Sequence, residues 1–357
     1  MLTRPNICSK EFIDRQFDHE VKGMSAVKHL VGKESDVDSD GVVLNPDLET
    51  EEGLTLGAGL NPHYMHIDTY HGTACALNEG IMRNVAVGGD PSMMFNIDNF
   101  LWPSPIPSEN NPDAEYKMAQ LVRANEALHD YTLRFRVPSI SGKDSMSMDK
   151  VAETKEGKTC RISSEPTLQF MVGSKVRDIK RSVTMDVKDP GDTVYVLGAT
   201  RDELGGSEFY RMQGKYGLQV PKVNARRNLS VYKRLHNAMQ KGLVKSCHGC
   251  YQGGLAVALA QTSFAGGYGM DVDLGKAARE VNSNEKVLFS QTQGRFVVTV
   301  SPENEAAFES ILNGQTSKMG TVRGDHDFVV RGLDGRVIIK EDVAQLKHAW
   351  KHRYASR

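Results

Sequence analysis

Hydrophobic positions in the first part of the chain alternate between helical and strand-like spacing. In GTACALNEGIMRNVAVGG (residues 72–89) apolar residues recur with a helical period, and the segment ends in two glycines. PSMMFNID (residues 91–98) is typical of a buried strand. A long helix is predicted from Asp113 to Arg134, because the preceding Asn-Asn-Pro-Asp is a good start for a helix. FRVPSIS (residues 135–141) predicts the next strand.

A polar stretch near residues 150–165 separates this region from a second one. The stretch, MDKVAETKEGKTCRISSEP, is rich in Lys and Glu and has no hydrophobic period. Strands and helices are predicted beyond it at residues 167–176, 192–200, 203–213, 228–242, 253–264, 294–300, 303–314, 317–324 and 342–352. We therefore predict an α/β (α+β) protein of two domains, residues 1–155 and 165–357.

Composition narrows the class of protein. The chain has 357 residues, 39% of them hydrophobic, which is enough for a large core. Its formal net charge of -1 provides no overall field toward nucleic acid or an anionic membrane. The longest apolar runs, such as GGLAVALA, are far shorter than the ~20 residues of a membrane span, and the N-terminus lacks a signal peptide's apolar region. Five cysteines with one close pair fit a reducing compartment. We expect a soluble, cytoplasmic protein with no nucleic-acid or membrane partner.

The segment SGKDSMSM, at the end of the strand predicted in FRVPSIS, is the first candidate for chemistry. Gly142, Lys143, Asp144 and Ser145 would offer backbone N–H groups, a cation, a carboxylate and a hydroxyl within one turn. These groups are the parts of a phosphate cradle with a metal-binding neighbour. The Walker A pattern is missing, and a polar turn without function is the alternative.

Other polar residues in the first region could hold a metal. SDVDSDG (residues 35–41) contains three acidic residues before a predicted strand, although a solvated turn is the simpler interpretation. Glu79 and Asn84 lie five positions apart on the predicted helix, so they do not share a face as an i,i+4 pair would. Asn96 and Asp98 lie at the end of a buried strand. Carboxylates and amides at strand ends are typical Mg²⁺ ligands.

The second region contains one cysteine pair. Cys247 and Cys250 flank His248 in SCHGCYQGG, a spacing found in redox pairs and in half of a zinc site. No second CxxC or HxxxH is present, which favours a structural pair of thiols. Tyr251 stands where haem attachment requires histidine, and no local sequence suggests a catalytic cysteine.

Taken together, these stretches resemble a known family. The chain resembles the second half of phosphoribosylformylglycinamidine synthases, in the aminoimidazole ribonucleotide synthetase superfamily, over essentially its whole length. Each motif alone is weak, but their order and spacing are specific. The motifs are RPNICSKEF, RQFDHEVKG, SDGVVLNP, NEGIMRNVAVGGDP, DNFLWPSP, PDAEYKMAQLVRANEALHDYT, ISGKDSMSM, LGGSEFYR, QGGLAVAL and LFSQTQGRF.

The resemblance implies a fold and an activity. It implies an N-terminal mixed sheet with helices that pairs with its counterpart in a dimer or tandem pseudodimer, followed by a C-terminal α/β domain. In the family, ATP phosphorylates the amide oxygen of formylglycinamide ribonucleotide, and ammonia then displaces the phosphate to form the amidine. The ammonia comes from a glutaminase domain or subunit, and this chain has no glutaminase-like segment.

The resemblance also assigns site residues. Asp98, or its neighbour Asn96, matches a nucleotide-contacting position. The residues expected to contact the phosphates of ATP and substrate, or a metal, across the seam with the first half are Gly142, Lys143, Asp144 and Ser145. The histidine thought to assist catalysis belongs to the first half, so we expect no catalytic residue in this chain.

A second, internal nucleotide site is implied within the half itself. Its predicted magnesium ligands are Asp40, Glu79 and Asn84. In the family the asparagine lies four residues after the glutamate, where this chain has Arg83. The family's His-Asp-x-Ser-Asp-Gly-Gly loop is His-Gly-Cys-Tyr-Gln-Gly-Gly at residues 248–254, and its Ser-Glu-Ser is Ser-Gln-Thr at residues 290–292. Because three carboxylates are lost, we expect weak nucleotide binding or none at the internal site.

The leading hypothesis is an ATP-dependent carbon–nitrogen ligase half that uses ATP and Mg²⁺. It would act on a small ribonucleotide together with a first-half domain or subunit and a glutaminase. One alternative is a catalytically degenerate half that serves as an assembly scaffold. Another is a stand-alone synthetase-like homodimer, although the N-terminal signature differs from that group.

Overall fold

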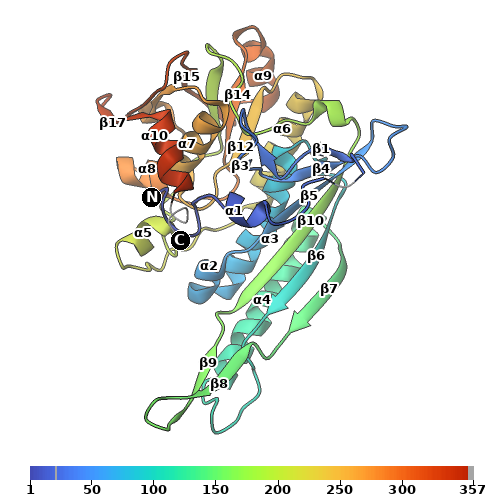
Figure 1. Cartoon of the computed structure of the whole chain (residues 1–357), viewed down its shortest axis with the longest axis vertical. Helices are drawn as coiled ribbons and strands as arrows, with labels where there is room; N and C mark the ends of the chain where they lie inside the picture. The colour runs from blue at the N-terminus through green and yellow to red at the C-terminus, as the bar shows by residue number, and fades with distance from the viewer. Residues whose placement is uncertain (21, 353–357) are drawn as a thin grey trace.

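The structure, a computed structural model, describes residues 1–20 and 22–352. Its two large sheets have six and seven strands, and helices pack against both (Figure 1). This architecture confirms the predicted α/β (α+β) class.

The first sheet is mixed, as predicted. Its strands are β1 (Ser25–Val27), β4 (Val42–Leu44), β5 (Gly53–Gly59), β6 (Met94–Leu101), β7 (Ser139–Ser145) and β10 (Thr167–Val176). They lie in the order β1-β4-β5-β10-β6-β7. All neighbours are antiparallel except β6 and β7, which are parallel and are connected by a long helix.

Helices cover one face of this sheet. They are α2 (Pro62–Ile67), α3 (Thr69–Ala86) and α4 (Ala114–Phe135). Two glycines let α3 lie directly on the strands: a Cβ at Gly59 would lie 2.0 Å from the carbonyl oxygen of Ala76, and one at Gly80 would lie 2.6 Å from a methyl group of Val172. The close approach explains why α3 is buried on almost all sides.

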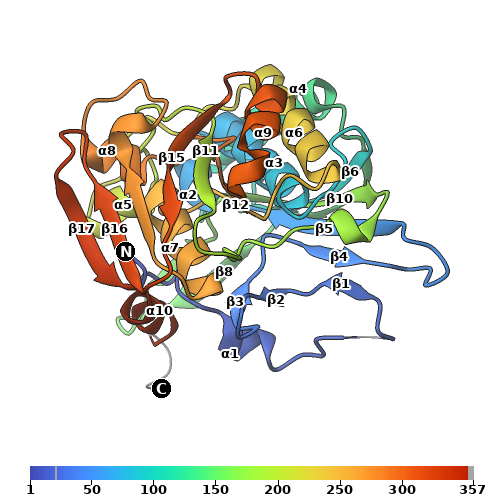
Figure 2. The ribbon, with the colours of Figure 1, turned by 90° about the horizontal axis from the view of Figure 1, so that it is seen from above.

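The other face of the sheet lacks such a cover. Figures 1 and 2 show α3 and α4 on the same side of β5, β10 and β6. On the opposite side Ala58, Met171 and Ile97 lie in register across these three strands, and the last two are 39% and 37% exposed. Side chains alternate between the faces of a strand, so this row belongs to one apolar surface, which we call the open face.

The second sheet has the order β12-β14-β11-β15-β13-β16-β17, and only β13 and β16 run parallel. Its strands are β11 (Thr193–Leu197), β12 (Ser246–Gly249), β13 (Met270–Asp273), β14 (Phe296–Val300), β15 (Thr316–Val322), β16 (Asp327–Arg331) and β17 (Val337–Asp342). The longer helices of this unit are α6 (Ala225–Gln240), α7 (Gly254–Gly266), α9 (Glu305–Leu312) and α10 (Val343–Lys351).

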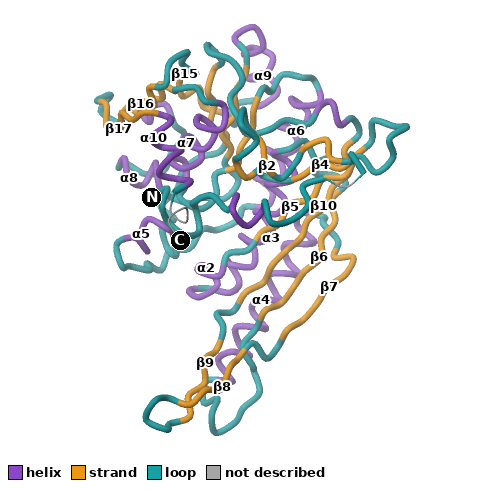
Figure 3. Tube along the Cα trace, in the orientation of Figure 1, coloured by secondary structure: helices purple, strands orange, loops and turns teal. Residues whose placement is uncertain are grey.

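Short elements complete the described chain (Figure 3). They are α1 (Glu11–Asp14), β2 (Leu30–Val31), β3 (Val37–Asp38), β8 (Asp149–Glu153), β9 (Thr159–Ser163), α5 (Glu208–Met212), α8 (Asn284–Phe289) and the 3-10 turns η1 (Ile179–Arg181), η2 (Leu274–Lys276) and η3 (Pro302–Asn304). Among the described helices, none has the length and apolar character needed to cross a membrane.

The predicted boundary between the two regions needs correction. The polar stretch at residues 150–165 contains the β8–β9 hairpin, which turns at Gly157 with a φ of +77° and projects from one end of the molecule (Figure 1). The strand predicted at 167–176 is β10, which lies between β5 and β6 in the first sheet. The change from the first sheet to the second therefore falls after Val176, because β10 pairs with strands more than 60 residues earlier.

The strand predicted at residues 135–141 is also displaced. Phe135 ends α4, and Arg136 closes the helix in the left-handed conformation with a φ of 58°. Pro138 follows, and the strand β7 begins only at Ser139. As a result, the SGKDS segment is an edge strand of the sheet and not a turn after a strand.

Candidate functional site

The buried cluster around Asp40 joins the two sheets. Asp40 precedes β4, whereas His248 and Gly249 belong to β12. One carboxylate oxygen of Asp40 lies 2.8 Å from Nδ1 of His248; the other accepts hydrogen bonds from the Gly249 amide (3.0 Å) and the Tyr251 hydroxyl (2.6 Å). Each oxygen of this carboxylate therefore has a protein partner from the second region.

Arg83 on α3 extends the same cluster. Its Nη2 lies 2.7 Å from Oε1 of Glu79, one helical turn earlier, and its guanidinium lies 4.2 Å from the centre of the Tyr251 ring. The side chain of Asn61 donates to the other oxygen of Glu79 at 3.0 Å. A protein cation thus lies between Glu79 and the groups that surround Asp40.

The cluster fixes the charge of its members. Burial would raise the pKa of Asp40, but His248 and the hydrogen bonds from Tyr251 and Gly249 hold it below its usual value. Burial opposes the charge of Arg83, yet Glu79, Tyr251 and Asp40 raise its pKa above the usual value. Burial and the charge of Asp40 raise the pKa of Tyr251. At neutral pH the cluster contains a carboxylate, a guanidinium and a neutral phenol.

The three predicted magnesium ligands of the internal site are not brought together as one set. The amide of Asn84 donates to the carbonyl oxygens of Gly80 and Val172 and accepts from the hydroxyl of Thr55, so it is engaged by the helix and the sheet. Asp40 and Glu79 both lie next to Arg83, and no group of three or more metal-ligating His, Cys, Asp or Glu side chains exists within residues 1–20 and 22–352. This arrangement does not fit a divalent cation, because Arg83 already supplies positive charge beside both carboxylates.

A cavity of about 400 Å³ adjoins this cluster. Its walls come from the N-terminal segment, α2, α3 and three segments of the second region, and they include Asn6, His63, Tyr64, Gln252 and Gln291. Gln291 is hydrogen-bonded to the Tyr64 hydroxyl. Gln252 and Gln291 stand at two of the positions where the family has an acidic residue. The cavity therefore lies where the resemblance implies the internal site.

The cysteine pair has a structural position. Cys247 packs in the apolar core that includes α3 and α6, whereas Cys250 packs in the core around α7 and α10. Both are free and buried, and burial raises the pKa of Cys250 to about 11. These thiols stay protonated at neutral pH, as expected for packing residues.

A second candidate site lies at the sheet edge formed by β6 and β7. Asp98 on β6 lies opposite Gly142 on β7, and Asn99 and Phe100 lie opposite Lys143 and Asp144. A Cβ at Gly142 would come within 2.9 Å of a carboxylate oxygen of Asp98. Glycine at this position therefore leaves room for the carboxylate.

The predicted phosphate-binding residues divide between the two faces of this edge. Asp98 alternates with the buried Phe100, so its side chain lies on the helix side of the sheet, and Asp144 shares that side through its register with Phe100. Lys143 and Ser145 lie on the open face, where their side chains are hydrogen-bonded to each other. A ligand could contact the two carboxylates and also Lys143 and Ser145 only if it extended around the edge strand β7.

The carboxylates at this edge have an unusual environment. Burial, and then the charge of Asp144, raise the pKa of Asp98. No side-chain hydrogen bond or ion pair to Asp98 or Asp144 is present among the described residues. Both carboxylates are therefore available to a cation, in contrast to Asp40.

Some lining residues had no signal in the sequence. Asn61, His63 and Tyr64 lie at the start of α2, where a short helix follows β5 without a hydrophobic period. Arg83 was noticed only as a departure from the family pattern. Asn61 and Pro62 indicate a helix start, but a helix start does not indicate a cavity wall.

Comparison with known families agrees with the predicted resemblance. Residues 189–332 match the family of AIR synthase related proteins, C-terminal domain. The match covers the second sheet except β17 and its helices except α10, so the resemblance is confirmed for this part of the chain.

Solved structures share the fold of nearly the whole chain. Phosphoribosylformylglycinamidine synthase II from Thermotoga maritima is 16% identical, with a TM-score of 0.68 over 91% of this chain and 48% of that chain. T. maritima PurL complexed with FGAR is 17% identical, with a TM-score of 0.67 over 89% and 49%. T. maritima PurL complexed with ATP is 17% identical, with a TM-score of 0.68 over 96% and 49%.

The chain spans about half the length of these solved structures. At such identities the similarity establishes a common fold. The predicted fold of an aminoimidazole ribonucleotide synthetase-like half is therefore confirmed.

Proposed function

We propose that this chain is one half of an ATP-dependent carbon–nitrogen ligase, a phosphoribosylformylglycinamidine synthase of purine biosynthesis. In the proposed reaction, ATP phosphorylates the amide oxygen of formylglycinamide ribonucleotide, and ammonia displaces the phosphate to form the amidine. A glutaminase domain or subunit would supply the ammonia. The fold shared with proteins that bind FGAR and ATP supports this proposal.

One observation carries the proposal of a half-site: the polar edge of β6 and β7 adjoins the open face. Ile97 lies in register with Met171 on β10 and with Ser141 on β7, so the apolar row reaches β6 and is bordered by the polar edge strand. Exposed apolar surface rimmed by polar groups marks an interface or a ligand groove. A first-half domain packed on the open face would place its own residues beside the edge cluster.

The two pairs at the edge suggest different tasks. Lys143 and Ser145 would contact phosphate oxygens from the open face through an ammonium and a hydroxyl. Asp98 and Asp144 would hold Mg²⁺ that accompanies ATP, because among the described residues neither carboxylate has a side-chain partner and bound Mg²⁺ usually takes only one or two carboxylates. The metal would offset the negative charge of the phosphates. The two carboxylates would orient the metal, and Lys143 and Ser145 would orient the nucleotide.

The test is turnover of formylglycinamide ribonucleotide with ATP and ammonium by the chain reconstituted with a first-half partner. The double variant Asp144→Ala, Ser145→Ala should lower kcat/KM by about 100-fold or more, since groups that contact phosphates in the transition state are lost. The matched control is Ser108→Ala, Glu109→Ala, an exposed hydroxyl and carboxylate pair elsewhere.

Circular dichroism and melting should be unchanged in both double variants. Equal turnover by the edge variant and the control would refute the proposed role of β7. Turnover by the isolated chain would instead favour the stand-alone homodimer.

The closed internal cluster supports a second candidate, an assembly scaffold without catalytic contacts. Arg83, Gln252 and Gln291 occupy the surroundings of the internal cavity with groups that satisfy one another or the protein. If the edge variant keeps full activity and the complex still requires this chain for assembly, the scaffold is the better description.

A further inference from the structure

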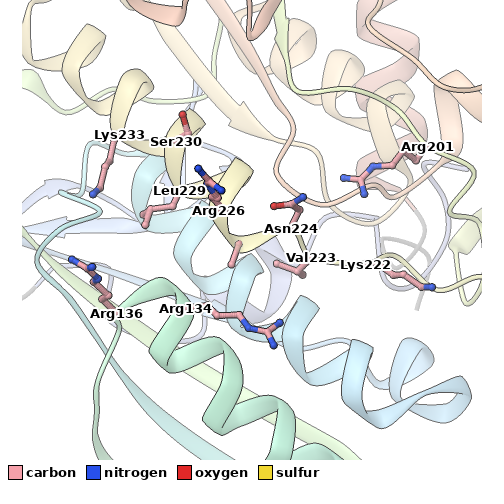
Figure 4. Close-up of a pocket in the computed structure, with 11 residues that line it drawn as sticks. Arg134, Arg136, Arg201, Lys222, Val223, Asn224, Arg226, Leu229, Ser230 and Lys233 are labelled. Carbon is pink, nitrogen blue, oxygen red and sulfur yellow. The ribbon is translucent and has the colours of Figure 1, made fainter.

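A basic groove lies apart from both candidate sites, where the end of α4 meets the start of α6 (Figure 4). Its volume is about 880 Å³. The residues that line it are Arg134, Arg136, Arg201, Lys222, Val223, Asn224, Ala225, Arg226, Leu229, Ser230 and Lys233. The groove shares no residue with the internal cavity or with the edge cluster.

The lining has one sign of charge. Six of the eleven residues are Arg or Lys and none is Asp or Glu, although the whole chain has nearly equal numbers of the two kinds, 44 and 45. Arg134 is paired with Asp130 at 2.7 Å, and Arg201 lies 3.9 Å from Glu203. For the other four cations no ion pair occurs within the part of the chain that the structure describes. A like-charged cleft of this kind focuses positive potential.

The cations come from both structural units. Arg136 caps α4 in the left-handed conformation, and this places it past the helix end, beside the groove (Figure 4). Arg226, Ser230 and Lys233 follow a helical spacing of four and three residues, so they share one face of α6. A ligand in the groove could therefore contact α4 and α6 together.

The groove also has apolar and neutral polar surface. Val223 and Ala225 are buried and Leu229 is half-buried at its base, while Asn224 and Ser230 can donate hydrogen bonds. The volume is within the range of small-molecule sites. Guanidinium and ammonium groups are the usual partners of phosphate oxygens in proteins.

We propose that this groove binds a ligand that carries a chain of two or more phosphate groups. Several cations held close together repel one another, and a compact ligand with several negative charges removes that repulsion. A single carboxylate would leave most of the cations unpaired. The chain's net charge of -1 argues against a nucleic-acid track, which needs basic surface over a longer path.

The phosphate chain could come from a nucleoside triphosphate or from an inorganic oligophosphate. Both are tested by calorimetry with the isolated full chain at about 0.15 M salt, with ATP and inorganic tripolyphosphate as probes. Tighter binding of ATP would assign part of the affinity to contacts between the nucleoside and the apolar base. Equal binding would assign it to the phosphate chain.

The groove variant is Arg226→Gln, Lys233→Gln, in which both changed side chains are exposed and lack an ion pair among the described residues. We expect at least tenfold weaker binding of tripolyphosphate. The matched control, Lys155→Gln, Lys158→Gln in the turn of the β8–β9 hairpin, removes the same charge and should bind within twofold of the unmodified chain.

The proposal is overturned if millimolar tripolyphosphate does not bind, or if both double variants weaken binding equally. It is also overturned if a single-stranded oligonucleotide binds more tightly than either probe and depends on the same two residues. Because the proposed function places Ser145 among the phosphate contacts, the titration is repeated with Asp144→Ala, Ser145→Ala, in which the two groove substitutions should still weaken tripolyphosphate binding at least tenfold. If Asp144→Ala, Ser145→Ala by itself abolishes binding, the edge of β7 is the site and the groove is not.

Discussion

The internal cluster and the sheet edge both contain carboxylates. The carboxylate of Asp40 in the internal cluster has hydrogen-bond partners, whereas those of the sheet edge lack side-chain partners among the described residues. Asp40 accepts from three donors, and the half-buried Arg83 donates to its backbone carbonyl oxygen, so its charge is compensated within the chain. Asp98 and Asp144 have no such partners among the described residues, and the strand that carries Asp144 is exposed. The internal cluster therefore joins the two sheets, whereas the sheet edge is where we propose that a ligand and a partner bind.

The same contrast applies to apolar surface. The core on either side of β12 is closed, with Cys247 and Cys250 buried in separate clusters. On the open face Ile97 and Met171 remain more than a third exposed. Burial of such a row typically stabilises an interface by about 25 cal/mol per Å² of apolar area removed from water.

The largest expected effect breaks the internal cluster. Asp40→Asn should reduce the free energy of unfolding by about 3–5 kcal/mol, because His248 and the Gly249 amide lose a buried charged acceptor. Urea denaturation would measure it as a lower midpoint with an unchanged slope. The exposed Asp334→Asn is the control and should change stability by less than about 0.5 kcal/mol. An equally small effect for Asp40 would show that the network is not what joins the sheets.

The next effect separates charge from packing in the same cluster. Arg83→Met keeps an aliphatic side chain on α3 but leaves Glu79 without its cation, and should cost about 2–3 kcal/mol because the pair is only partly exposed. Urea denaturation at pH 7 measures the loss. A loss below about 0.5 kcal/mol would show that Glu79 does not depend on this cation.

A third test concerns the open face. Ile97→Lys with Met171→Lys should weaken association with a first-half partner at least tenfold, about 1.4 kcal/mol or more, because two charges would be buried at the interface. Stability of the isolated chain should change by less than about 0.5 kcal/mol, since both positions are already exposed. Sedimentation of the mixture measures the association.

The control for the open face is Val337→Lys with Ile338→Lys on β17, at two exposed apolar positions of the other sheet. These changes should leave association as it is. Equal weakening by both pairs would mean that added charge in general, and not the open face, governs the assembly.

The smallest effect has the opposite sign to that of Asp40. Asp98→Asn should stabilise the isolated chain at pH 7 by about 1 kcal/mol or less. The folded pKa of Asp98 is raised above its usual value, so its favourable contribution exists below that usual value and is lost as pH rises through the folded pKa. Between pH 4 and pH 8 the melting temperature should therefore decline less for the variant than for the unmodified chain. A variant that is less stable at pH 7 would show that the Asp98 carboxylate is compensated within the chain, as that of Asp40 is.

Local signals predicted much of the fold correctly. The helical spacing of residues 72–89 and the helix start expected at Asp113 correspond to α3 and α4, because apolar spacing and the residues favoured at a helix start are local properties, although Asp113 makes no capping hydrogen bond with its side chain. The strand after α4 was misplaced, because the left-handed cap at Arg136 and Pro138 delay it. The polar hairpin was missed, because strands exposed to solvent need no hydrophobic period.

The candidate sites were predictable only in part. Glu79 and Arg83 are one turn apart, so their pairing follows from the sequence. The contact of Asp40 with His248 spans 208 positions and has no local signal. The basic groove was not predicted for the same reason, because Arg136 and Lys233 are far apart in the chain. The nearly balanced net charge of the whole protein gave no sign of it either.

The sequence by itself determined the class of fold, most helices and the family resemblance, because periodicity, helix ends and ordered motifs are properties of neighbouring residues. Only the tertiary structure decided which carboxylates are compensated. It placed β10 inside the first sheet, brought Arg83 and Tyr251 to Asp40, and left Asp144 on β7 without a side-chain partner among the described residues. Charge compensation depends on distances of a few ångström between groups that the chain carries far apart, and those distances exist only after the sheets have formed.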